Sequence, residues 1–146
     1  VCGRFLCPDL KAKIEAKTRE IALELMGARI CNTLTLKISL VATVVNGEEY
    51  TGAVWTGCDG SKTDKTAYPI AIQRDRPWRE TVRTLAHELC HVEQARRGRL
   101  QYRIWATDRQ VHVRWDGVEV GSLRSIPYHT RPWEVEAREV GERFSK

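Results

Sequence analysis

Residues 76–98 read RPWRETVRTLAHELCHVEQARRG, and this stretch predicts a long amphipathic helix on which the rest of the fold depends. Its apolar residues recur at the spacing of one helical face, so that face should pack on the core. Pro77 suits the first turn of a helix, and Gly98 suits the left-handed conformation that ends one. We therefore expect the helix to begin near Pro77 and to end before Gly98. The apolar face consists of Trp78, Val82, Leu85, Leu89 and Val92.

The same helix carries the motif H-E-x-x-H, formed by His87, Glu88 and His91. Residues four positions apart lie on one face of a helix, about one turn apart, so the two imidazoles can bind one metal ion. The residues around the motif are uncharged, which indicates a buried setting where polar side chains need partners. Neutral imidazole suits Zn²⁺, and a catalytic zinc normally has three protein ligands and one open position. Glu88 is placed to act as general base toward a water molecule that the metal has acidified.

The third metal ligand has several candidates, all of them C-terminal to the motif. Residues 132–144 predict a last helix whose apolar stripe lies next to Glu134, whereas Glu136 fits a surface charge. His112 alternates with the apolar residues of a strand, so we expect it to be exposed. His129 precedes the last helix and lies close in sequence to the two glutamates.

Side chains just before the last helix are candidates for a second catalytic role. Tyr128 and His129 could each donate a hydrogen bond to the oxyanion that forms when a carbonyl is attacked, and Arg131 could do the same.

These motifs together resemble the zincin metallopeptidases. A glutamate on a helix after the motif resembles their thermolysin-like gluzincin branch. H-x-x-Q at His91–Gln94 with P-W-E-x-E-A at Pro132–Ala137 resembles small phage and bacterial SprT-like minimal metallopeptidases. The resemblance implies that Glu134, the first glutamate of an E-x-x-A pattern, is the third zinc ligand, with Glu136 as the alternative. Arg138 stands where aspartate is common, so no carboxylate that would orient a ligating histidine is evident.

The remaining segments predict a further helix, several strands and a hairpin. Apolar residues at helical spacing indicate a helix over residues 9–29. Pro69 predicts that the strand over residues 67–72 lies at a sheet edge, because proline cannot donate a ladder hydrogen bond. Asp116-Gly117 between alternating valines predicts a hairpin over residues 111–120. Also expected are a strand over residues 33–40 followed by a turn at Asn46-Gly47, a strand over residues 50–56 and a mobile loop over residues 57–64.

These elements predict a single α+β metallopeptidase domain over residues 1–146, with zincin-like architecture. In chain order it has an N-terminal helix, a small twisted mixed sheet, the active-site helix, a β-hairpin and a C-terminal helix that carries the third metal ligand.

The composition is that of an ordinary globular protein. Its 146 residues carry 24 Lys and Arg against 19 Asp and Glu, a net charge of +5, and 42% of them are hydrophobic. No stretch approaches the roughly 18 uncharged apolar residues of a membrane helix. The first residues lack an initiator Met and the features of a secretion signal, which suggests a trimmed start. Five cysteines without a C-x-x-C pair argue against a disulfide framework and favour a cytoplasmic setting.

The leading hypothesis is a zinc metallopeptidase that cleaves an extended peptide or protein substrate lying along the strand at residues 67–72. A rival hypothesis is a protein that binds nucleic acid, because clustered arginines could contact phosphates. A third is a metal-stabilised binding module without turnover, against which Glu88 argues because a structural site needs no base. The sequence indicates neither the substrate nor the oligomeric state. The clustered arginines are Arg96, Arg97, Arg99 and Arg103.

Overall fold

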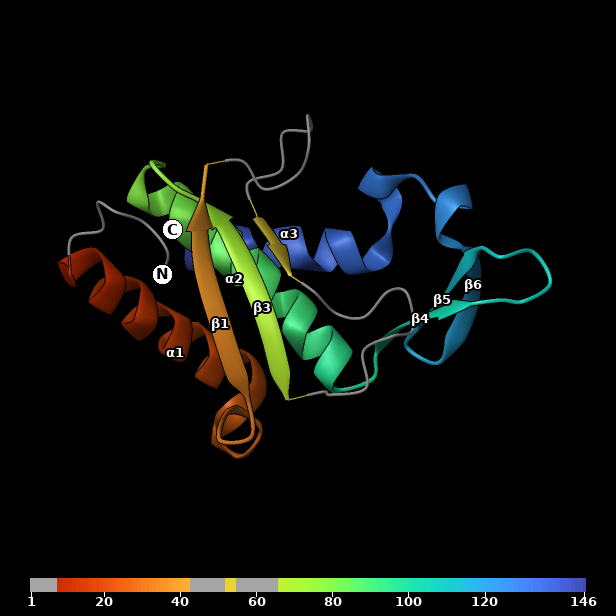
Figure 1. Cartoon of the computed structure of the whole chain (residues 1–146), viewed down its shortest axis with the longest axis horizontal. Helices are drawn as coiled ribbons and strands as arrows, with labels where there is room; N and C mark the ends of the chain where they lie inside the picture. Colours follow the sequence, from red (N-terminus) through yellow and green to blue (C-terminus); the bar gives the residue numbers. More distant parts are fainter. Residues whose placement is uncertain (1–7, 43–51, 55–65) are drawn as a thin grey trace.

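Helix α2 (Trp78–Arg96) is the element against which most of the described structure packs. The computed structural model describes residues 8–42, 52–54 and 66–146 and shows an α+β fold, which confirms the predicted class (Figure 1). α2 ends before Gly98, whose φ of 71° is the left-handed conformation expected there. The other elements are α1 (Pro8–Cys31), β1 (Thr35–Val41), β2 (Gly52–Val54), β3 (Ala67–Gln73), β4 (Leu100–Ile104), β5 (Val111–Trp115), β6 (Val118–Ser122), the short 3₁₀ helices η1 (Leu123–Ser125) and η2 (Tyr128–Thr130), and α3 (Pro132–Phe144).

The first sheet has its described strands in the order β1-β3-β2, with β1 parallel and β2 antiparallel to β3. The prediction that the strand with Pro69 lies at the edge is therefore wrong, because β3 is central. The backbone N–H of Arg74 donates to Val41 O, so even-numbered residues of β3 direct their backbone groups toward β1. Pro69 is odd-numbered and lies beyond the Ile70–Ile72 segment that pairs with β2. Its missing N–H therefore interrupts no described ladder.

The main core lies between one face of this sheet and the helices α1 and α2. Burial alternates along β3, and Tyr68, Ile70 and Ile72 are each 1% exposed, so alternate side chains point at the helices. Ile14 and Ile21 of α1 are equally buried, which confirms the apolar stripe predicted for the N-terminal helix.

The second sheet is an antiparallel meander of β4, β5 and β6 that follows the C-terminal end of α2 (Figure 1). Its β5–β6 hairpin confirms the prediction. Asp116 and Gly117 at the turn have φ values of 47° and 82°, the positive pair that a type I′ turn requires. β4 is not among the expected strands, although its apolar residues alternate with polar ones over five residues.

His112 lies in this second sheet and is buried, which corrects the expectation that it is exposed. Its ring stacks on Trp105 with centroids 3.7 Å apart, and its Nε2 lies 2.7 Å from Asp108 Oδ2. Trp105 and Asp108 belong to the segment between β4 and β5. They cover the face of β5 that the alternation of apolar residues predicts to be exposed. Among the described residues, His112 joins no group of side chains that could hold a metal ion.

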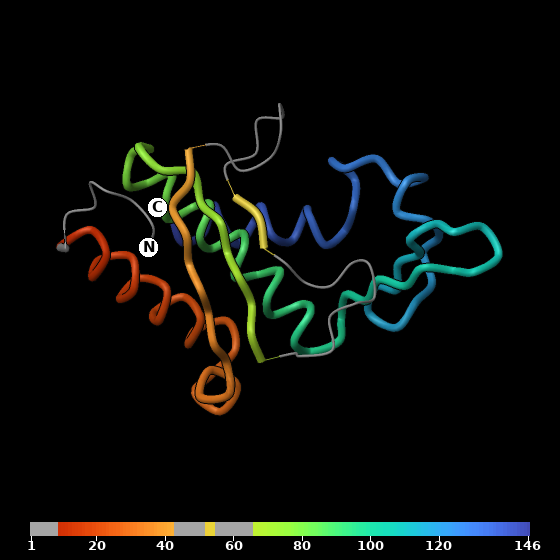
Figure 2. Tube along the Cα trace, viewed as in Figure 1, coloured from red at the N-terminus to blue at the C-terminus, as the bar shows by residue number. Residues whose placement is uncertain are grey.

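Helix α3 has the predicted bounds and returns from the second sheet along α2, as the blue end of the tube in Figure 2 shows. Trp133 and Ala137 are fully buried. Gly141 allows the two helices to approach closely, because a Cβ there would lie 2.9 Å from Arg83 O. This packing brings the first turn of α3 beside the motif on α2.

Some expectations fall outside the described residues. They are the turn at Asn46-Gly47, the loop over residues 57–64, and the strand over residues 50–56 apart from β2. Among the residues that are described, no helix is long and apolar enough to cross a membrane.

Candidate metal centre

Helix α2 presents His87 and His91 to the N-terminal end of α3. The two rings meet edge to face, with centroids 4.9 Å apart, and their Nε2 atoms are 3.2 Å apart. His91 is buried and His87 is partly exposed, so the pair opens toward solvent on the His87 side. The spacing of four residues on one helix gives this arrangement directly.

Glu134 completes the group from the first turn of α3. Its Oε2 lies 3.2 Å from His87 Nε2 and 3.3 Å from His91 Nε2. Trp133 and Ala137 fix the orientation of the helix because both are fully buried. We call His87, His91 and Glu134 the histidine cluster.

The histidine cluster could hold a metal ion, because its three ligand atoms converge at nearly equal separations. Glu134 is buried, and its Oε2 accepts no hydrogen bond from the described residues. A buried carboxylate oxygen without a donor is costly, and a shared cation would remove that cost.

The electrostatics of the histidine cluster keep its carboxylate ionised. Burial acts to raise the pKa of Glu134, but its contacts with His87 and His91 outweigh burial and lower that pKa below its ordinary value. Burial acts to lower the pKa of His91, but the carboxylates of Glu134 and Glu88 outweigh it and raise that pKa. Both directions describe one attraction, between an ionised Glu134 and the imidazoles beside it, which keeps the carboxylate in the anionic form that a metal ion binds.

Glu88 lies next to His87 on α2 and is buried under the edge of the first sheet. Burial raises its pKa, against the lowering effect of His91 and His87. Strand β2 lies directly over it at Gly52. A Cβ at position 52 would collide with Thr84 Cγ2 and lie 3.0 Å from Glu88 Oε1. Glycine at this position therefore leaves the room that the Glu88 carboxylate occupies.

Two residues near the histidine cluster are absent from the sequence-based prediction of the site. Gln94 accepts a hydrogen bond at Oε1 from His91 Nδ1 over 2.8 Å, so an amide takes the place of the missing carboxylate. The signal for it is its position three residues after His91 on the same helix. Gly52 is the other, and a lone glycine in a short strand carries no signal of its contact with Glu88.

Glu136, the alternative third ligand, lies in a different group. Arg99 donates to Glu136 from Nη1 over 2.8 Å and from Nη2 over 2.6 Å, and Nη1 also donates to Glu93 over 2.9 Å. Cys90 lies beside the same carboxylate, with its Sγ 3.7 Å from Glu136 Oε1. Burial raises the pKa of Cys90, which keeps the thiol protonated. We call Cys90, Glu93, Glu136 and Arg99 the arginine cluster, in which the guanidinium supplies the cation.

Two of the four arginines that suggest a nucleic-acid surface form ion pairs within the protein. Arg97 pairs with Glu93 at 3.0 Å, and Arg99 also pairs with Asp116 at 3.0 Å. These pairs explain two of the four arginines without a phosphate ligand. Binding of nucleic acid stays a prediction.

Tyr128 and His129 lie in η2, immediately before α3, and the roles predicted for them stay predictions. His129 is exposed, and its ring meets that of Tyr128 edge to face at 5.7 Å. Arg131 donates to Ile126 O over 3.0 Å and to Leu123 O over 3.1 Å, so its guanidinium serves to fold this segment.

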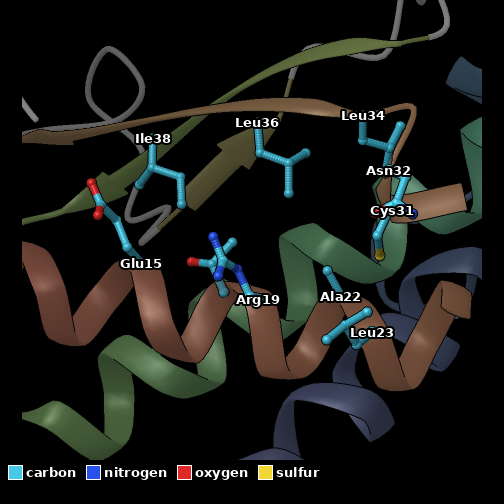
Figure 3. A pocket seen from close by; sticks show the side chains of 10 residues that line it. Glu15, Arg19, Ala22, Leu23, Cys31, Asn32, Leu34, Leu36 and Ile38 are labelled. Atoms are coloured by element: carbon cyan, nitrogen blue, oxygen red, sulfur yellow. The ribbon is translucent and has the colours of Figure 1, made fainter. Parts of the chain in front are cut away.

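A groove of about 580 Å³ lies between α1 and β1. Figure 3 shows Leu34, Leu36 and Ile38 pointing toward α1, with Glu15 and Arg19 on the helix beside them. None of its lining residues belongs to α2 or α3, so the groove is separate from the histidine cluster.

Comparison of the chain with known protein families, curated proteins and solved structures finds no match.

Proposed function

We propose that the chain is a zinc-dependent hydrolase of peptide bonds. The observation that carries this proposal is the triangle of His87 Nε2, His91 Nε2 and Glu134 Oε2, with sides of 3.2, 3.2 and 3.3 Å. A zinc ion bound at about 2.0–2.1 Å in tetrahedral geometry separates its ligand atoms by about 3.3–3.4 Å. The triangle thus has nearly the size of three corners of a zinc tetrahedron.

Each residue then has a defined task. When bound, a zinc ion supplies a Lewis acid that polarises a carbonyl oxygen and acidifies water. Glu88 accepts a proton from the water molecule as the water oxygen attacks the scissile carbonyl carbon. The same carboxyl group returns that proton to the amine nitrogen as the C–N bond breaks. A pKa raised by burial suits a group that must both accept and return a proton near neutral pH.

A hydrolase fits these residues better than a binding module without turnover. Structural zinc sites normally have four protein ligands, whereas the described residues offer three in the histidine cluster, and His87 is partly exposed. A purely structural site also has no use for a buried carboxyl group beside its ligands.

The substrate proposed is an extended peptide, and β2 provides its docking edge in place of the strand at residues 67–72. Ala53 pairs with Ala71 of β3, so the backbone groups of Gly52 and Val54 point away from β3. Among the described strands this edge of β2 has no neighbour, and it lies near Glu88, since a Cβ built at Gly52 would be 3.0 Å from Glu88 Oε1. Backbone pairing would hold a peptide there whatever its side chains.

Metal content tests the first half of the proposal. The full chain, purified without chelator, should carry about one zinc, and His91→Ala and Glu134→Ala should each lose it. His129→Ala, which removes an exposed histidine outside the histidine cluster, should keep it. A wild-type chain that takes up no zinc after reconstitution would overturn the proposal.

Hydrolysis of an unfolded protein by the zinc-loaded chain tests the second half. Glu88→Gln should keep the zinc and lower the rate by about 100- to 10,000-fold, the usual contribution of a general base. Undiminished hydrolysis in Glu88→Gln would show that Glu88 has no such role. Zinc binding without any hydrolysis in the wild type would favour the binding module.

A further inference from the structure

Gln94 is fully buried on α2, and its amide group contacts both helices of the site. Oε1 lies 2.8 Å from His91 Nδ1. Nε2 lies 3.1 Å from Trp133 O and 3.2 Å from Glu136 Oε1. One amide thus joins a side chain of the histidine cluster to the backbone carbonyl that immediately precedes Glu134.

These contacts allow one orientation of the amide and one tautomer of the imidazole. Trp133 O and the Glu136 carboxylate are acceptors, so the side of Gln94 that faces them must be the NH₂ group. The oxygen of Gln94 then faces His91 Nδ1, and a hydrogen bond requires the proton on Nδ1. The Nε2 lone pair of a neutral His91 is left free, pointing at the position shared with His87 and Glu134.

The orientation of Gln94 is itself held by the arginine cluster. Arg99 binds both carboxylate oxygens of Glu136, at 2.8 and 2.6 Å, and lies over the ring of Trp115 at 4.9 Å. Glu136 is therefore fixed as an ionised acceptor for the NH₂ group of Gln94. A reversed amide would place two acceptors against each other there, which is strongly unfavourable in a buried setting.

We propose that Gln94 is a positioning residue of the metal centre, which sets the tautomer and ring orientation of His91 and ties them to the position of Glu134. This inference rests on the proposed function. It adds that the arginine cluster acts on the metal centre through a single buried amide.

Zinc affinity of the full chain, measured by competition with a chromophoric chelator, gives the first test. Gln94→Met replaces the amide by an apolar group of similar size and should weaken zinc binding about 10- to 100-fold. Gln101→Met is the matched control. It removes an amide on β4 that donates to Gly98 O over 3.1 Å, and it should leave zinc affinity within about twofold. Equal affinities of the wild type and a folded Gln94→Met would overturn the inference.

Exchanging the two side chains gives a second test, which remains informative even if Gln94→Met folds poorly. Gln94→Glu keeps an acceptor for His91 but sets a carboxylate against that of Glu136, so zinc binding should weaken. Adding Glu136→Gln restores a donor beside the new acceptor, and zinc affinity should recover at least partly in the double variant. A double variant no better than Gln94→Glu would contradict the proposed coupling.

The tautomer of His91 is measured without zinc, which separates this inference from the proposed function. In the metal-free wild type at alkaline pH, ¹⁵N NMR should show His91 with Nδ1 protonated and Nε2 bare, and Gln94→Met should give a mixture of tautomers. A wild type that shows this tautomer but binds no zinc would overturn the proposed function alone. A tautomer unchanged by Gln94→Met would overturn the role of Gln94.

Discussion

The histidine cluster and the arginine cluster both take side chains from α2 and α3, but they differ in what balances their carboxylates. Each takes a glutamate from α3, Glu134 in one and Glu136 in the other. Arg99 places a guanidinium within 2.9 Å of both glutamates of the arginine cluster. The histidine cluster has no arginine or lysine paired with its ligand atoms in the described structure, and Glu134 Oε2 accepts no hydrogen bond there.

This difference separates a structural ion pair from a candidate metal site. Both groups place potential ligand atoms close together, so ligand proximity alone does not distinguish them. A cation from the chain itself satisfies the carboxylates of the arginine cluster. The carboxylate of the histidine cluster faces only imidazoles among the described residues, so this cluster could take a metal ion from solution.

The largest effect that tests this comparison is on zinc affinity. Glu134→Gln should weaken zinc binding by about 1,000-fold or more, which is about 4 kcal/mol, because it replaces a charged ligand by a neutral amide. Glu136→Gln should weaken it by no more than about 100-fold, because Glu136 acts only through Gln94. Chelator competition on the two full-length variants measures both values. Similar losses in the two variants would show that the clusters do not differ in this way.

The next effect is on stability and concerns the internal cation. Arg99→Met should lower the free energy of unfolding of the zinc-free chain by about 3 kcal/mol, because it removes the guanidinium from Glu136 and leaves Glu93 with Arg97 alone. Urea unfolding measures this loss. Arg103→Met is the control, since Arg103 is exposed on β4, and it should change stability by less than about 0.5 kcal/mol.

The loss in free energy of unfolding caused by Arg99→Met should also depend on pH. Burial acts to raise the pKa of Glu136, but hydrogen bonds from Arg99 and Gln94 outweigh it and hold the pKa below its ordinary value. A carboxyl group with a lowered pKa stabilises the fold above its unfolded pKa of about 4.3, and this contribution is lost as the pH falls through its folded pKa. Arg99 also binds Glu93, whose pKa burial raises, so the gap between wild type and Arg99→Met should narrow in acid as Glu93 and then Glu136 take up protons. A gap that widens in acid would mean that Arg99 stabilises the fold by another route.

The helices that carry the site could be predicted because local signals define them. Pro77 and Gly98 bracket α2, Pro132 begins α3, and the spacing of His87 and His91 puts both imidazoles on one face. In each case the signal lies within one element. The resemblance to the gluzincins implied Glu134 rather than Glu136 as the third ligand, and the place of Glu134 beside the apolar stripe of one helix supported that choice.

The features that could not be predicted depend on contacts between distant segments. β3 is central because β1 and β2 flank it, and the described part of β2 pairs with Ile70–Ile72 and does not reach Pro69. Gln94 has its role because α3 brings Trp133 O and Glu136 to it, about 40 residues away in sequence. Gly52 matters only because β2 crosses α2 at Glu88. The spacing of residues along one helix or strand does not predict contacts between distant segments.

The smallest effect concerns β2, which lies over Thr84 and Glu88 of α2 at Gly52. Gly52→Ala places a methyl group against Thr84 Cγ2 and 3.0 Å from Glu88 Oε1. It should lower the free energy of unfolding by about 2 kcal/mol, as overpacking usually does. By displacing Glu88 it should also lower peptide hydrolysis about 10- to 100-fold, with zinc content unchanged.

A second substitution separates these two consequences of Gly52→Ala. Thr84→Ser removes the Cγ2 methyl group and keeps the hydroxyl, so the Gly52→Ala/Thr84→Ser variant should recover most of the lost stability. The crowding of Glu88 remains in that variant, and hydrolysis should stay low. If hydrolysis returned together with stability, Gly52 would serve only the packing of β2 on α2. Loss of hydrolysis at restored stability would instead show that a glycine backbone at this edge keeps the Glu88 carboxylate in place.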